Sequence, residues 1–389
     1  MSLYDDVPLI VPYGGSSGGG SISGFVRVED GRFRNDAGWL GVRALTEFSM
    51  PYLCSINRHD EVARRLDRAV ATRRNCVRYL LMAKYLFSFT PGQFNYWQSI
   101  ERAVDMANDR GLYVEGCLFA DAQELLPFHH DRVALVREYA GWCSDRPGVI
   151  PQLANEPFKN GWESATDPKL LELAREFAAI YKSRQFSVGD PVDFVTSESE
   201  GQPLRGELNT LARTSDMLVL HGDRHHDPAR YARWVDHLKG FTDFRDDPTI
   251  RRCGLWHDEP MGMASVFVPG RRDNRAEALV AAAACTAIFQ MAFTTHYISE
   301  QDDLIPGLEE SAFVADIPHG PDWQYINAGV AHSPVTGFDG FEKVRPCTNG
   351  REAWACAYGH HKGTIRWADG FTPTRVFNGA NVEVWRATK

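Results

Sequence analysis

The sequence of 389 residues has no apolar run near the 18 residues that a membrane-spanning helix needs. Residues 1–6 also lack the basic end and the apolar stretch of a secretory signal. We therefore expect a cytoplasmic protein with no membrane partner. A Gly/Ser-rich tract at residues 14–21 has the composition of a flexible tether, which leaves association with a larger particle open.

Basic residues are too few for a nucleic-acid partner. The 42 Lys and Arg against 51 Asp and Glu leave a net charge of −9, so no basic excess is available to displace counterions from a phosphate backbone. Aromatic residues are better represented, at 12% of the chain. Flat aromatic faces suit stacking on sugar rings, although most aromatic residues of any protein lie in its core.

Metal-type cysteine spacing is also missing. The eight cysteines are scattered, and only Cys347 and Cys356, on either side of an Asn-Gly turn, are placed to pair across a hairpin. His225 and His226 are adjacent, so on a regular element they point apart, and no third ligand accompanies them. We expect no metal and no cofactor.

From residue 41 onward, short apolar runs alternate with helical patterns. Eight such alternations over roughly 260 residues predict a (β/α)8 TIM barrel. A doubly wound open sheet is the alternative, but no Gly-rich phosphate turn follows the first strand, which ends at Phe48. The expected strands are residues 42–48, 76–81, 112–119, 149–154, 192–196, 217–220, 253–257 and 293–297. The expected helices include residues 59–72, 91–110, 132–143, 204–213, 228–238 and 275–291, with one more that begins near residue 166.

The two ends of the chain have a different character. Residues 25–38 alternate around an Asp-Gly turn, which predicts an N-terminal β-hairpin. Beyond about residue 338, short β-rich segments separated by Asn-Gly or Asp-Gly turns predict a small C-terminal β-rich appendage. We therefore divide the chain into a tether (1–24), a catalytic barrel with its hairpin (25–335) and the appendage (338–389).

Two glutamates stand at the ends of predicted strands. Glu156 ends the fourth strand and Glu259 ends the seventh, and each is followed by proline. A charge that emerges from a dry core is costly unless the protein uses it, and barrels of this class carry their active sites at these strand ends. Paired carboxyl groups about 5–5.5 Å apart are the machinery of glycoside cleavage with retention of configuration.

These features resemble the retaining glycoside hydrolases of clan A, the cellulase and β-mannanase superfamily. The resemblance covers residues 25–300 and is carried by the hairpin, by the segment 75–78 on the second strand, by Asn155-Glu156-Pro157 and by Glu259. It implies that Glu156 is the acid/base and Glu259 the nucleophile. It also implies that Asn155 holds the sugar 2-hydroxyl, and that Arg78 hydrogen-bonds the nucleophile and keeps it ionised.

The binding residues follow the clan pattern less closely. His221 matches its usual histidine, but Asp223 stands where a tyrosine is expected, and Tyr297 where a tryptophan commonly forms the sugar platform. We expect Trp256 or Tyr297 to take over that stacking. An oligosaccharide or polysaccharide is thus the expected partner.

Plainer interpretations of the same residues stay open. Glu156 and Arg78 can form a structural ion pair, and the assignment of Glu259 can slip to Asp258 beside it. Further carboxylates near predicted strand ends can bind sugar or simply be solvated: Glu47, Asp121, Glu198 and Glu200. Two other functions also fit, namely a catalytically weak carbohydrate-binding or particle-assembly protein, and a barrel enzyme for a non-sugar substrate.

Overall fold

The computed structural model describes residues 22–190, 201–221, 247–259, 276–295, 305, 307–359 and 361–389. Its central element is a sheet of eight parallel strands in the order β8-β7-β6-β5-β4-β11-β10-β9. The two outermost strands of this order, β8 and β9, contact each other, so the sheet is a nearly closed barrel. The strands are β4 (Arg43–Thr46), β5 (Cys76–Leu80), β6 (Tyr113–Phe119), β7 (Val149–Ala154), β8 (Ser187–Gly189), β9 (Met217–His221), β10 (Gly254–Glu259) and β11 (Ala292–Thr295).

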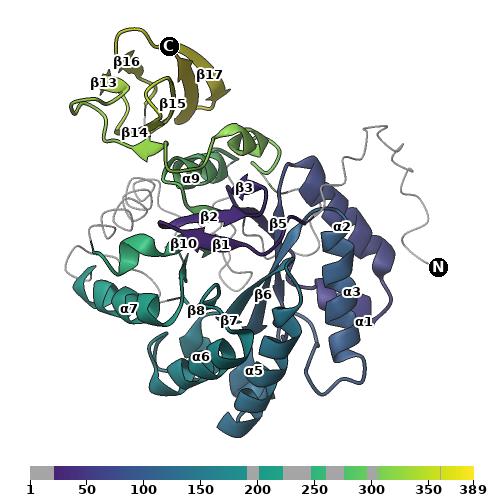
Figure 1. Cartoon of the computed structure of the whole chain (residues 1–389). Helices are drawn as coiled ribbons and strands as arrows, with labels where there is room; N and C mark the ends of the chain where they lie inside the picture. The colour runs from purple at the N-terminus through teal and green to yellow at the C-terminus, as the bar shows by residue number, and fades with distance from the viewer. Residues whose placement is uncertain are drawn as a thin grey trace.

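Helices surround this barrel, as Figure 1 shows, and the predicted (β/α)8 architecture is confirmed. In α6, Asp167 caps the first turn by accepting the backbone N–H of Lys169, and the apolar positions from Leu170 to Phe177 face the strands. The helices are α1 (Met50–Ser55), α2 (His59–Ala71), α3 (Tyr96–Asn108), α4 (Ala122–Leu125), α5 (His129–Ser144), α6 (Pro168–Tyr181), α7 (Gly201–Thr214) and α9 (Ala276–Ile288). Short 3-10 segments add η1 (Pro157–Asn160), η4 (Ile250–Arg252) and η5 (Ala312–Asp316).

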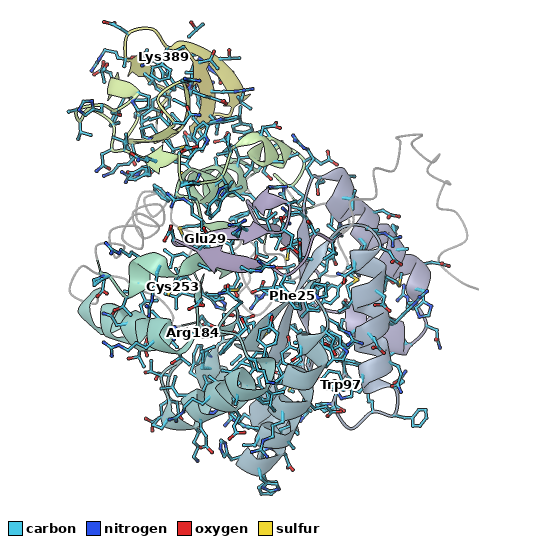
Figure 2. The ribbon with its side chains drawn as sticks, in the orientation of Figure 1. Phe25, Glu29, Trp97, Arg184, Cys253 and Lys389 are labelled. Atoms are coloured by element: carbon cyan, nitrogen blue, oxygen red, sulfur yellow. The ribbon has the colours of Figure 1, made fainter. Side chains whose placement is uncertain are left out.

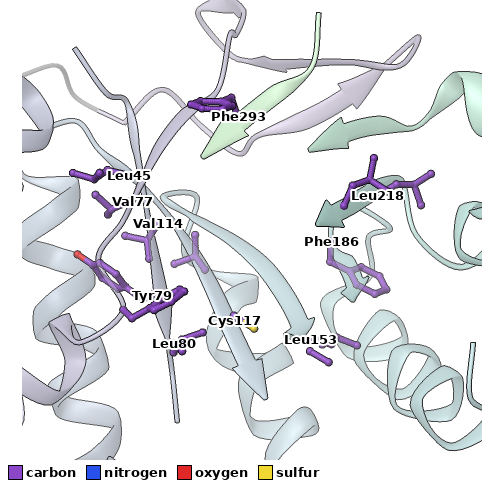
Figure 3. Packing of buried hydrophobic residues seen from close by; sticks show 14 of the residues in the cluster. Leu45, Val77, Tyr79, Leu80, Val114, Cys117, Leu153, Phe186, Leu218 and Phe293 are labelled. Atoms are coloured by element: carbon purple, nitrogen blue, oxygen red, sulfur yellow. The ribbon is translucent and has the colours of Figure 1, made fainter. Parts of the chain in front are cut away.

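The strands are buried on both faces. One set of alternate residues packs between strands and helices; Leu45, Val77 and Val114 of this set are drawn in Figure 3. The other set forms a separate apolar cluster in which Ala44, Cys76 and Tyr113 occupy matching positions of neighbouring strands. Burial on both faces explains why the sequence of these strands is nearly continuously apolar.

An N-terminal hairpin closes the end of the barrel at which the strands begin. It consists of β1 (Arg27–Glu29), β2 (Arg32–Asn35) and the short β3 (Gly38–Trp39), and Asp30 and Gly31 take the left-handed conformations that a tight hairpin turn requires. The N–H of Gly31 donates to the carbonyl of Arg252 at 3.2 Å. Figure 2 shows Glu29 of this hairpin near Cys253, just before β10.

The C-terminal region is β-rich, as predicted, and packs on α9. Its larger antiparallel sheet has the order β12-β14-β15-β18-β17, and β13 pairs with β16. Helix α9 contacts β11 of the barrel and also β14, β15 and β18, which explains why its sequence is apolar on every face. The strands are β12 (Gln324–Tyr325), β13 (Val335–Asp339), β14 (Lys343–Thr348), β15 (Glu352–Tyr358), β16 (Thr364–Trp367), β17 (Thr372–Asn378) and β18 (Val382–Thr388).

Some sequence-based expectations differ from the structure. In the described part of the chain, the barrel strand between β7 and β9 is Ser187–Gly189. The strand expected at residues 192–196 and the helix expected at residues 228–238 lie outside the described residues. Cys347 lies opposite Trp354 and Cys356 lies opposite Arg345, so no disulfide crosses the hairpin, and all eight cysteines are free thiols. In the part of the chain that the structure describes, no helix has the length and apolar character to cross a membrane.

Candidate active site

A buried polar cluster lies where β5, β7, β8, β9 and β10 end. Arg78 of β5 is fully buried, and its Nη2 is 2.9 Å from Oδ2 of Asp258 on β10. The same nitrogen donates to Oδ1 of Asn155 at 2.9 Å and to Oε1 of Gln152 at 3.1 Å. Arg78 Nε lies 3.6 Å from Glu115 on β6. The guanidinium group thus brings together residues of four strands, with two carboxylates to balance its charge.

Asp258 sits at an irregularity of β10. The register between β9 and β10 shifts between His257 and Glu259, so Asp258 is the extra residue of a bulge. Its Oδ2 faces Arg78 and also accepts a hydrogen bond from Gln152 at 3.2 Å. Its Oδ1 lies 3.1 Å from Nε2 of His221. Both carboxylate oxygens of Asp258 are therefore engaged inside the barrel.

Glu259 ends β10 in register with His221, and its side chain lies outside what the structure describes. On this strand, the carboxylate that contacts Arg78 is that of Asp258. The contact implied by the clan resemblance, from Arg78 to Glu259, therefore stays a prediction.

Glu156 follows β7 in a left-handed backbone conformation, with φ 42° and ψ 74°. A residue with a Cβ disfavours this region by roughly 1–2 kcal/mol, so surrounding groups must hold it there. Asp190 Oδ1 accepts the N–H of Glu156 at 2.8 Å. Asn160 donates from its side chain to the carbonyls of Asn155 and Glu156, the latter at 3.3 Å. The carboxyl group that these contacts place is almost fully buried and lies 3.4 Å from Nδ2 of Asn155.

His221 lies between two carboxylates. Its Nδ1 is 3.4 Å from Oδ2 of Asp190 and its Nε2 is 3.1 Å from Oδ1 of Asp258. Each ring nitrogen therefore faces one carboxylate oxygen. The imidazole therefore links the ends of β8 and β10 inside the cluster.

Of the two aromatic residues expected to stack on sugar, Trp256 lies away from this cluster. Trp256 is buried among residues that pack against the N-terminal hairpin, its indole N–H donates to Thr294 at 2.8 Å, and its ring packs edge-on against Phe33. This position is core. Tyr297, like Asp223, lies outside the described residues.

The Cys117 thiol lies on β6, between the strands that carry the cluster. Burial raises the pKa of Cys117 well above its usual value, with Arg78 acting in the opposite direction. Within the described ranges, no group of three or more His, Cys, Asp or Glu side chains is arranged to hold a metal ion.

Several members of the cluster did not emerge from the sequence. Glu115 and Gln152 carried a usable signal, because each is polar within an otherwise apolar strand. Asp190 follows a strand that was expected five residues later, and Asn160 stands in a loop with no pattern around it. Contacts between residues of separate loops leave no pattern in the sequence around either residue, so they cannot be predicted from it.

No protein-family profile matches the sequence, and no curated protein matches it. Solved structures do match. A family 5 glycoside hydrolase from Bacteroides vulgatus has a TM-score of 0.58 and 12% identity, covering 94% of this chain and 94% of that chain. The fold is that of family 5 glycoside hydrolases. A structure described only as a glycoside hydrolase has a TM-score of 0.58 and 9% identity, covering 94% and 97% of the two chains.

The catalytic domain of a mannanase from Streptomyces sp. SirexAA-E has a similar fold. It has a TM-score of 0.52 and 13% identity, covering 79% of this chain and 89% of that chain. The predicted resemblance to clan A is thus confirmed for the fold. At such low identity, the roles of individual residues must be argued from this chain's own contacts.

Proposed function

We propose that the protein is a retaining glycoside hydrolase that acts on a β-linked glycan. The observation that carries the proposal is the cluster around Arg78, which joins the Asn155-Glu156 end of β7 to the Asp258-Glu259 end of β10 on a family 5 fold. Ligands of such barrels bind at these strand ends. Two acidic strand ends on one rim match the requirement of glycoside cleavage for a carboxyl group on either side of the bond.

In this proposal Glu156 is the acid/base. It protonates the departing glycosidic oxygen and later removes a proton from the water that releases the product. Glu259 attacks the anomeric carbon and forms the covalent glycosyl-enzyme. Water then cleaves that intermediate, so two inversions restore the original configuration.

Asp258 is poorly suited to the role of nucleophile. Its side chain is fully buried, and its two oxygens face the guanidinium group of Arg78 and the imidazole of His221. A carboxylate engaged in this way is stabilised as an anion but has no oxygen directed to an incoming sugar. We therefore assign nucleophilic attack to Glu259 and charge balance to Asp258.

Asn155 is suited to hold the sugar 2-hydroxyl. Arg78 donates to its Oδ1, which fixes the orientation of the amide group and leaves Nδ2 as the donor beside the Glu156 carboxyl. A donor next to the acid/base can bind the oxygen of a neighbouring hydroxyl. Such contacts strengthen in the transition state of glycoside cleavage.

The test is hydrolysis of a panel of aryl β-glycosides and polysaccharides by the wild type, Glu156→Gln and Glu259→Gln. Each substitution keeps the size of the side chain and removes its acid or nucleophile, so we expect at least about a 10²-fold loss of kcat/KM for an unactivated substrate. Glu163→Gln is the matched control, because Glu163 is exposed in the loop after η1. Full activity in either site variant contradicts the assignment.

Azide separates the two roles. Added to Glu156→Ala, azide should restore turnover of an activated glycoside and give a glycosyl azide of retained configuration, because it attacks the covalent intermediate. Added to Glu259→Ala, it should replace the nucleophile and give the inverted azide. Binding of oligosaccharide without turnover, unchanged by Glu259→Gln, would instead support a carbohydrate-binding protein.

A further inference from the structure

We propose that Asp190 is a positioning residue that sets the place of the Glu156 carboxyl by holding its backbone; the proposal rests on the acid/base role given to Glu156 above. Asp190 follows β8, the strand next to β7 in the barrel. Its Oδ1 accepts the backbone N–H of Glu156 at 2.8 Å. No pattern in the sequence predicts a role for Asp190.

The hydrogen bond from the Glu156 N–H to Asp190 matters because of the backbone conformation that it maintains at Glu156. Glu156 is left-handed although it has a Cβ, and such a residue relaxes toward the extended region when its contacts are removed. Relaxation would rotate the Cα–Cβ bond and carry the carboxyl group away from Nδ2 of Asn155. A hydrogen bond to the N–H of Glu156 therefore controls where its side chain lies.

Asp190 is itself held from the other side. Its Oδ2 lies 3.4 Å from Nδ1 of His221, whose Nε2 lies 3.1 Å from Asp258. The side chains of these three residues are at most 1% exposed, so water has little access to compete for their contacts. The ends of β10, β9, β8 and β7 are thus joined in one chain of contacts that finishes at the Glu156 backbone.

A second contact acts on the same backbone. Asn160 donates to the carbonyl of Glu156 at 3.3 Å and to that of Asn155, while its Oδ1 accepts the N–H of Ala122 at 2.7 Å. Asp190 holds the peptide before Glu156, and Asn160 holds the peptides on both sides of it. Loss of either contact should displace the same carboxyl group.

The expected signature is selective for the leaving group. A misplaced acid cannot protonate the glycosidic oxygen, which matters for a poor leaving group and little for dinitrophenolate, which departs without a proton. We therefore expect Asp190→Ala to lower kcat/KM by about 10²-fold for a phenyl glycoside and to change it little for the 2,4-dinitrophenyl glycoside of the same sugar. Equal losses for both substrates would overturn the proposal.

Asn75→Ala is the matched control. Asn75 Oδ1 accepts the N–H of Arg43 at 2.8 Å, the same kind of contact at the opposite end of the barrel. This variant should lose stability, and its kcat/KM should show no preference between the two substrates.

If Asp190→Ala fails to fold, Asn160→Ala and Asp190→Asn take its place. In Asp190→Asn the amide that replaces the carboxylate has a single acceptor oxygen, so it can satisfy only one of the two groups that Asp190 holds. Its selective loss should therefore be smaller, whereas uniform losses overturn the proposal.

A measurement independent of turnover separates this inference from the proposed function. In protein labelled with 15N-glutamate, the Glu156 amide is identified by its absence from Glu156→Gln. Its proton should resonate downfield because a carboxylate accepts it, and should move upfield in Asp190→Ala. An unchanged signal overturns the positioning role even if the wild type hydrolyses glycosides. A wild type without hydrolysis refutes the proposed function and leaves this readout to decide on Asp190.

Discussion

Arg78 occupies a position where a cation is costly unless it is fully compensated. It is completely buried and contacts Asp258, Asn155 and Gln152, with Glu115 close by. The free-energy cost of removing these charges from water offsets much of their mutual attraction, so the group as a whole adds little net stability. Removing one member is different, because it leaves the others buried without compensation.

We therefore expect Arg78→Met to lower the free energy of unfolding by about 3–5 kcal/mol. The substitution fills similar space, but it leaves Asp258 with its charge toward β5 uncompensated. Urea unfolding followed by circular dichroism measures the change. Arg27→Met is the control: its ion pair with Asp36 is about half exposed on both sides and should contribute less than about 1 kcal/mol. Losses of equal size in the two variants would show that the buried partners of Arg78 do not depend on its charge.

At the residue scale, sequence reasoning identified members of the buried cluster where a charge interrupts a local pattern. Glu156 and Arg78 stood out because each is charged beside or within an apolar strand. Asp258 was weighed only as an alternative to Glu259, since strict alternation of strand faces cannot anticipate a bulge. Asp190 and Asn160 were missed because their partners lie in other loops, and that proximity is created by closure of the barrel.

At the scale of elements, the long helices and the β-rich character of the C-terminal region were predicted, and β8 was not. The segment 192–196 contains Val, Phe and Val and has high strand propensity, whereas Ser187–Gly189 is short and ends in glycine. Strand β8 exists because β7 offers it a parallel edge, not because of its own composition.

Helix α9 and the turn between β17 and β18 are linked through one side chain. Glu277 accepts the backbone N–H of Ala380 and, at 2.9 Å, that of Asn381. Because Glu277→Ala leaves both donors without their carboxylate, we expect a loss of about 1–3 kcal/mol and faster amide exchange over residues 372–388. Hydrogen-exchange mass spectrometry measures this. Glu309→Ala, at an exposed position, should leave exchange in that segment unchanged; equal effects would mean that the contact does not anchor the turn.

At the scale of the whole molecule, the barrel and the C-terminal sheet share one apolar core. Trp354 and Tyr358 of β15 and Val384 of β18 belong to the same buried cluster as Leu45 and Val77 of the barrel strands. Helix α9 is the layer between them. The sequence-based division at residues 335–338 falls within β13, which pairs with β16.

A shared core predicts that the two parts unfold together. Val384 is fully buried in β18, and an aspartate there would place an unpaired charge against α9, at a cost above about 3 kcal/mol. We expect Val384→Asp to lower the midpoint of one thermal transition that includes the barrel, because α9 cannot keep its packing when the sheet detaches. Differential scanning calorimetry of the full chain measures this, with Val376→Asp on the exposed strand β17 as the matched control. A barrel transition that stays at the wild-type temperature while a second, smaller transition moves would show instead that the C-terminal sheet folds as an independent unit.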